Sequence, residues 1–439
     1  MTPAGTGVIG LSDAARTALA GIVSTYAERR FEDVGGTSPD GVRLVDAEVL
    51  VPGRPGIVDV VAYAGGRVVH APLGLRAPQD DVRFTGDDDP VVGVLEDDDG
   101  TAVVFDVTRD VDLAALLLRI VSGHEVEPSL VRPLRENPSS ITLAMADAVA
   151  FTVFHEVLEG PRPDLELLLA LEEVGFNHLA APLAVWRRGG RDLGVVQEYL
   201  AGASSGYALA LTSVRDLYAS GGPPELAGGD FGAEAHRLGT MTARMHLGLD
   251  KAFGRRPGDT RQWALDIRAA LEAIAPDELE RPDVEELLEK LAGLEVAFQT
   301  IRTHGDFHLG RTVRTEQGWY VADFRPGGRL RTAKTAVDVP NTGDDASYRS
   351  PLADVADMMW SFGHVANVAA AERDPTGREG LDELADAWEA RNRRAFLAGY
   401  LGVPGISGLV APQREALAVV TSSFELLRAE VELARRAAR

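Results

Sequence analysis

Two aspartates, Asp306 and Asp323, are the residues whose types and spacing best fit a chemical role. Asp306 lies in the segment His-Gly-Asp-Phe-His at residues 304–308, and Asp323 is followed by Phe324. Short β-prone runs on either side of a Gln-Gly turn at residues 317–318 predict a hairpin that brings the two carboxylates together. In phosphoryl transfer one carboxylate accepts the acceptor's hydroxyl proton and another holds the Mg²⁺ that bridges the phosphates. We therefore predict Asp306 as the catalytic base and Asp323 as a metal ligand; two ordinary turn aspartates are the alternative.

These segments resemble the kinases related to the aminoglycoside phosphotransferases, and among them the bacterial maltokinases and glucosamine kinases. The similarity covers about residues 130–430, and residues 1–110 fit only loosely the extra N-terminal cap of such enzymes. The resemblance implies an α+β, bilobal, protein-kinase-like fold and an ATP- and Mg²⁺-dependent sugar kinase. Its supporting segments are VRPL at 131–134, GPRPDLE at 160–166, VQEY at 196–199, ARMH at 243–246, SPLAD at 350–354 and WEARN at 388–392.

The same resemblance implies roles for further residues. Gln197, Glu198 and Tyr199 would form the hinge that receives adenine through backbone hydrogen bonds. Glu166 falls where the family has its helix glutamate. Within the catalytic loop, His304 would brace the chain. The loop itself would be steadied by Asp354, for which a helix N-cap is the alternative role.

Two positions depart from the family pattern. Thr152 stands where a strand lysine normally meets the phosphates, and Arg311 stands where an asparagine or glutamine ligates Mg²⁺, which a guanidinium cannot do. We expect Arg311 to contact the phosphates in place of the lysine, and His308 or a water molecule to replace the lost ligand. The alternatives are that Arg311 pairs with a surface glutamate or that Arg325 supplies the cation. The departures also allow a nucleotide-binding pseudokinase.

The acceptor is predicted to be glucosamine, with maltose as the alternative. The chain continues after Asp323-Phe324 with a basic, glycine-containing segment and a long polar loop to Tyr348, whereas maltokinases have acidic and small residues there. An amino sugar needs a carboxylate for its ammonium group, and the last helix offers Glu425, Glu430 and Glu432. Trp388 could stack on the sugar, although a core position is the alternative.

The elements that must position these residues fall into a strand-rich first part and a helical second part. We predict a cap at residues 1–110, an N-lobe segment with the hinge at 111–203, and a C-lobe at 204–439. A helix is expected over residues 11–30, hairpins over 43–107, a helix over 163–175 and a buried strand over 193–200. From residue 207 onward the pattern is helical, with one β interruption at 301–325.

Composition limits the partners. The chain has 439 residues, a formal charge of −23 and no cysteine, which excludes disulfides and cysteine-ligated metals. Strong negative charge disfavours nucleic acid and anionic membranes. Without an apolar run long enough to span a bilayer or a signal-peptide pattern, we expect a cytoplasmic monomer or weak dimer. Its small-molecule partners are expected to be ATP and a sugar.

Overall fold

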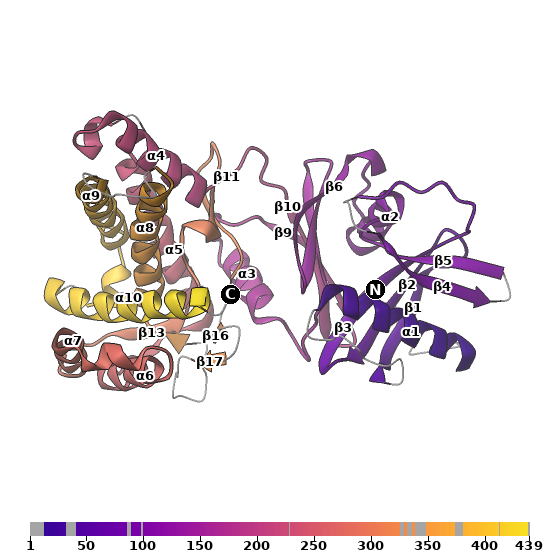
Figure 1. Ribbon diagram of the computed structural model, residues 1–439, viewed down its shortest axis with the longest axis horizontal. Helices are drawn as coiled ribbons and strands as arrows, with labels where there is room; N and C mark the ends of the chain where they lie inside the picture. Colours follow the sequence, from indigo (N-terminus) through magenta and orange to yellow (C-terminus); the bar gives the residue numbers. More distant parts are fainter. Residues whose placement is uncertain are drawn as a thin grey trace. The chain divides into compact units, whose positions relative to one another are not determined.

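The hairpins predicted near the start of the chain form a five-stranded antiparallel sheet in the computed structural model (Figure 1). Helix α1 (Asp13–Arg30) packs on one face of this sheet, where Val23 and Tyr26 meet Val60 and Ala62 in a shared core. The strands lie in the order β1 (Arg43–Val51), β2 (Gly56–Ala64), β3 (Arg67–Arg76), β5 (Gly100–Asp106) and β4 (Val91–Asp97). The predicted α+β character of this segment is confirmed.

The structure describes residues 13–31, 41–85, 89–97, 100–227, 229–324, 329–331, 336–338, 348–373, 381–411 and 413–437. Contacts divide the chain into two compact units. Unit 1 comprises Met1–Arg162 and Ala180–Ala201, and unit 2 comprises Pro163–Leu179 and Gly202–Arg439. No helix in these described ranges is long and apolar enough to cross a membrane.

Unit 1 contains a second antiparallel sheet and helix α2 (Val111–Ser122). A buried carboxylate joins the two sheets: Asp59 of β2 forms an ion pair with Arg188 of β9 at 2.6 Å and contacts His70 of β3 at 2.7 Å. The second sheet has the order β6 (Val131–Asn137), β7 (Ser140–Met145), β8 (Val149–Phe154), β10 (Arg191–Glu198) and β9 (Pro182–Arg188). The buried strand predicted over residues 193–200 is therefore β10, and the sequence boundary near residue 110 falls inside one compact unit.

Unit 2 is mainly helical, as predicted. The helix expected at residues 163–175 is α3 (Pro163–Glu173), and it groups with this unit rather than with the sheet that precedes it. In Figure 1 helix α10 lies across α8, and α6 and α7 also pack against it. The long helices are α4 (Gly206–Ser220), α5 (Gly232–Phe253), α6 (Thr260–Ile274), α7 (Pro282–Ala292), α8 (Pro351–Arg373), α9 (Leu381–Leu401) and α10 (Arg414–Ala437).

The β interruption predicted at residues 301–325 is present but extends further. Strands β14 (Thr312–Arg314) and β15 (Trp319–Val321) form the expected hairpin, in which Thr312 pairs with Val321. The polar loop that follows was expected to be irregular, yet it contains β16 (Arg329–Arg331) paired with β17 (Ala336–Asp338). After this loop, β18 (Tyr348–Arg349) pairs with β13 (Gln299–Arg302), the strand that directly precedes the segment containing Asp306.

Two glycines allow α5 and α9 to cross closely. A Cβ on Gly239 would come far inside contact distance of the Phe396 carbonyl oxygen, and one on Gly399 would do the same with the His236 carbonyl oxygen. This crossing sets the positions of His246 on α5 and Tyr400 on α9, which are hydrogen-bonded to each other at 2.9 Å. His246 also contacts Asp354, which supports the segment before Asp306, so this crossing helps to position that segment.

We expect Gly239→Ala to lower the free energy of unfolding by about 1–3 kcal/mol, because the added methyl group meets backbone atoms that cannot rotate away. Gly248→Ala on the same helix is the matched control, since its nearest neighbour is the flexible end of Leu171 at 2.9 Å. Chemical denaturation followed by circular dichroism measures both. Equal effects of the two variants would contradict a backbone constraint at the crossing.

Candidate active site

The segment around Asp306 is held by a buried carboxylate on α8. Asp354 accepts hydrogen bonds from the backbone N–H groups of His304 at 2.8 Å and Gly305 at 3.0 Å. His246 contacts the same carboxylate through Nε2 at 3.2 Å. Burial would raise the pKa of Asp354, but these hydrogen bonds lower it below the usual value, so the group stays charged. The role predicted for Asp354 is confirmed.

His304 connects the catalytic segment to the one that carries Asp323. Its Nε2 donates to the Ala322 carbonyl oxygen at 3.0 Å, and its ring lies 5.2 Å from that of Phe307 and 5.0 Å from that of Phe324. Burial lowers the pKa of His304, which favours the neutral imidazole that this single donated bond requires. The neighbouring Gly305 has φ +87°, a conformation that side chains rarely adopt.

Asp306 accepts from cations on both carboxylate oxygens. Arg428 Nη1 lies 2.7 Å from Oδ1, and Arg311 Nη2 lies 2.9 Å from Oδ2. His308 Nε2 is 3.7 Å from Oδ2. Burial alone would raise the pKa of Asp306, but His308 and Arg428 hold it well below the usual range. The carboxylate therefore remains ionised at any physiological pH.

Asp323 lies close to Asp306 because both contact Arg311. The second guanidinium nitrogen, Nη1, is 3.3 Å from Asp323 Oδ2. The backbone of Asp323 has φ +57°, in the left-handed region that is uncommon for non-glycine residues. Such conformations cluster at functional sites, where surrounding contacts hold them in place. The predicted approach of the two carboxylates is thus confirmed, and Arg311 turns toward them rather than toward a surface glutamate.

The other side of Asp306 is formed by α8 and α10. Arg428 of α10 lies 3.6 Å from Asp357 and 3.1 Å from Glu432, and its guanidinium lies over the ring of Trp360 at 5.1 Å. Burial raises the pKa of Asp357 to about 7, although the charge of Arg428 opposes the shift. These residues line one side of Asp306. We call the following four the Arg428 cluster: Arg428, Asp357, Glu432 and Trp360.

The chain is similar in sequence and in fold to known kinases. No family model matches the chain. It is 33% identical to a glucosamine kinase of Streptacidiphilus jiangxiensis over 261 residues, which span 54% of this chain and 53% of that protein. It is 26% identical to a glucosamine kinase of Mycolicibacterium smegmatis over 263 residues, or 56% of this chain and 64% of that one. The chain thus spans about half to two thirds of these relatives.

A solved glucosamine kinase in complex with glucosamine, ADP and inorganic phosphate superposes with a TM-score of 0.63. The match covers 97% of this chain and 98% of that one, at 19% identity. The chain has the fold of a glucosamine kinase. This confirms the predicted protein-kinase-like fold, including its N-terminal part, because the match extends over nearly the whole length.

Three residues predicted to bind the sugar acceptor lie away from Asp306 or already have other partners. Trp388 is fully buried and donates its indole N–H to Ser213 at 3.0 Å, so it is a core residue and cannot stack on a sugar. Glu425 is held by Arg393, with both oxygens at 2.7 Å. Burial raises the pKa of Glu430, and the charges that act on it are those of Glu278 and Arg281, in and next to the short helix η5 (Pro276–Glu280). No member of the Arg428 cluster is among them.

The predicted nucleotide residues have defined partners. The N–H groups of Glu198 and Tyr199 donate to the carbonyl oxygens of Ala181 and Ala148. The side-chain amide of Gln197 donates to the Ala180 carbonyl oxygen at 3.0 Å. The backbone N–H groups of Glu198 and Tyr199 are thus already paired, and the hinge role of the three residues stays a prediction.

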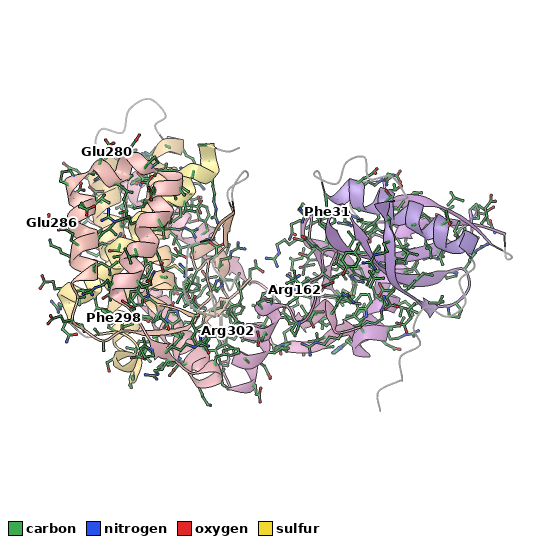
Figure 2. The ribbon with its side chains drawn as sticks, turned by 90° about the horizontal axis from the view of Figure 1, so that it is seen from below. Phe31, Arg162, Glu280, Glu286, Phe298 and Arg302 are labelled. Carbon is green, nitrogen blue, oxygen red and sulfur yellow. The ribbon has the colours of Figure 1, made fainter. Side chains whose placement is uncertain are left out.

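Thr152 and Glu166, the other two residues for which the resemblance implies a position at the nucleotide, also have partners within their own units. The Thr152 hydroxyl is paired with that of Thr142 on β7 at 2.9 Å. Glu166 of α3 contacts Arg302 of β13 at 2.8 Å, and Arg302 is labelled in Figure 2. The helix glutamate thus ties α3 to the strand that leads into the catalytic loop, and any part in nucleotide binding stays a prediction.

Sequence patterns missed Arg428, Asp357 and Trp360, although Glu432 of the same cluster was among the predicted carboxylates. Arg428 is separated from Asp306 by 122 positions, and nothing in the local pattern of α10 distinguishes it from the other arginines near the end of the chain. The spacing of Asp354, Asp357 and Ser361 was a usable signal, because residues three and four apart share one face of a helix. Ser361 indeed accepts from the Leu309 N–H at 3.3 Å. Arg325 lies outside the described residues.

Asp357→Asn should stabilise the protein increasingly as the pH rises from 4 to 7. The carboxyl has a pKa of about 7 in the folded state and about 4 when unfolded. Its ionisation therefore lowers the free energy of unfolding progressively between pH 4 and pH 7, and it has no effect below pH 4. The difference between variant and wild type should grow to at most about 4 kcal/mol. Denaturant unfolding at pH 4, 5.5, 7 and 8 measures it.

Glu372→Gln provides the control on the same helix, because Glu372 pairs with Arg215 at the surface. Its effect on the free energy of unfolding should be small and nearly constant over this pH range. A pH-independent effect of Asp357→Asn would show that Asp357 does not titrate near neutrality.

Proposed function

We propose that the protein is an ATP-dependent kinase that phosphorylates glucosamine to glucosamine 6-phosphate. The observation that carries this proposal is the placement of Asp306 between Arg311 and the Arg428 cluster, with Asp323 beside it. The names of the related proteins and the shared fold support the same activity. Maltose remains a predicted alternative acceptor.

Asp306 would act on the acceptor hydroxyl as an orienting group and late proton acceptor. A carboxylate has about four lone-pair positions, so contacts with two guanidinium groups still leave room for a hydroxyl. Because its pKa is low, Asp306 cannot remove a proton from a free alcohol. It can hold the hydroxyl in line with the phosphorus and take the proton as the new O–P bond forms.

The donor set near Asp306 suits a single Mg²⁺ ion. Mg²⁺ prefers oxygen ligands and is commonly held by one or two carboxylates, with phosphates and water completing the octahedron. Asp323, and through its remaining lone pairs Asp306, can provide such oxygens. No group of three histidine, aspartate or glutamate side chains forms a metal site within the described ranges, and His308 as a ligand stays a prediction. The bound ion would bridge phosphates and neutralise their charge.

The phosphates also need a cation from the protein, since Thr152 replaces the strand lysine. Arg311 is the candidate, because its guanidinium has five N–H donors and contacts the carboxylates with only two nitrogens. A fixed guanidinium suits phosphate oxygens better than an ammonium does when the geometry is bidentate. Loss of this donor should weaken transition-state stabilisation.

The Arg428 cluster offers a site for the ammonium group of the sugar. Asp306, Asp357 and Glu432 all contact Arg428. Arg311 also pairs with Asp306, and Arg435 with Glu432, so the charge of an ionised Asp357 is opposed mainly by the shared Arg428. A second cation at this cluster would balance the charge and would lower the pKa of Asp357. Trp360 lies beside it, with the Arg428 guanidinium over its ring and His364 stacked on the ring at 4.8 Å.

The acceptor assay tests the function directly. We expect ATP consumption to be fastest with glucosamine when glucosamine, N-acetylglucosamine, glucose, maltose and an aminoglycoside are compared. Asp306→Asn should lower kcat by about 10²–10⁴-fold, because the amide cannot accept the proton. Nucleotide binding without turnover of any acceptor would instead support the pseudokinase alternative.

Replacement of Asp357 tests the ammonium site. Asp357→Asn should raise KM for glucosamine and narrow the ratio of kcat/KM between glucosamine and glucose by about tenfold, the effect of losing roughly 1.4 kcal/mol of charge-assisted binding. Glu425→Gln is the matched control, because Glu425 is held by Arg393. If only the Glu425 variant lost discrimination, the ammonium would bind at Glu425 rather than at Asp357.

A further inference from the structure

Arg311 occupies the position where a metal ligand is expected and contacts both catalytic carboxylates. Nη2 is 2.9 Å from Asp306 Oδ2, and Nη1 is 3.3 Å from Asp323 Oδ2. One guanidinium thus links the residue that meets the acceptor to the residue that meets the metal ion. Its side chain is only 21% exposed, so solvent screens these contacts incompletely.

The backbone on which Arg311 is mounted is fixed at both ends. Its N–H donates to the His308 carbonyl oxygen at 2.8 Å, within the short helix η6 (Leu309–Arg311). Its carbonyl oxygen accepts from the Ala322 N–H at 2.9 Å, directly before Asp323. The guanidinium therefore keeps its place between the carboxylates through the same hairpin that brings Asp306 and Asp323 together.

We propose that the guanidinium of Arg311 replaces a second metal ion, so that the site binds one divalent ion together with the nucleotide. The inference rests on the proposed nucleotide-dependent phosphoryl transfer. An amide at this position would offer an oxygen to a cation, whereas a guanidinium has no lone pair to offer. It also repels a second cation at short range, while its own charge meets the phosphate oxygens.

This arrangement accounts for two sequence departures together. The chain lacks the strand lysine and the amide ligand at the same time, and it gains one positive charge between the two carboxylates. A cation that is part of the chain needs no free metal ion above the amount bound to ATP. The reaction should therefore depend on the ATP–Mg²⁺ complex alone, without further activation by excess Mg²⁺.

The test counts bound ions directly. Mn²⁺ is titrated into the full chain with saturating ADP, and free Mn²⁺ is followed by electron paramagnetic resonance. We expect one bound ion per chain for the wild type and two for Arg311→Gln, in which an amide oxygen replaces the cation. Arg314→Gln removes an arginine that pairs with Glu234, and this control should bind one ion. Arg311→Lys keeps the charge and should also bind one.

Two bound ions in the wild type would overturn the inference, as would a single ion in a folded Arg311→Gln variant that still binds ADP. Should that variant fail to fold, the wild-type count decides alone. The outcome is separable from the proposed function. One ion without transfer to any sugar would preserve the inference and remove the kinase assignment, whereas two ions with rapid glucosamine phosphorylation would do the reverse.

Discussion

The buried carboxylate of Asp354 is the contact on which the arrangement of the active site depends. It accepts the two backbone N–H groups that precede Asp306, and it can do so while buried because His246 contacts it from α5. A buried charge without such partners would cost several kcal/mol. The close crossing of α5 and α9 brings Tyr400 to His246, so the packing of two helices determines the position of the catalytic loop.

Helix α8 positions the rest of the site through one face. Asp354 holds the loop backbone, Asp357 meets Arg428, and Ser361 accepts from the Leu309 N–H. Helix α10 packs against α8 and supplies the guanidinium that completes the surroundings of Asp306. Because α8 contacts both the loop and α10, a small displacement of this helix would alter the hydrogen bonding and charge around Asp306 together.

The sequence predicted those features that depend on neighbouring residues. The hairpin between β14 and β15 follows from its turn, and the support by Asp354 follows from its place at the start of a helix within a recognisable segment. It did not predict Arg428, whose contact with Asp306 joins positions 122 apart. The sequence also suggested a sugar-stacking role for Trp388, although the residue is in the core. Its local segment is polar and does not reveal that the indole N–H donates to Ser213 on another helix. Strands β16 and β17 were missed because three-residue strands lack a clear alternation.

The charges around Asp306 explain how a site can tolerate losing both a lysine and an amide ligand. Two guanidinium groups face the two carboxylates, so the nearest charges nearly cancel before any nucleotide binds. In the proposed reaction the phosphoryl group would be stabilised by one divalent ion and by Arg311, which is already oriented between the two carboxylates. The same cations keep Asp306 strongly acidic. In the proposed kinase reaction such a carboxylate would orient the acceptor hydroxyl rather than ionise it, which fits a loose transition state in which the proton leaves late.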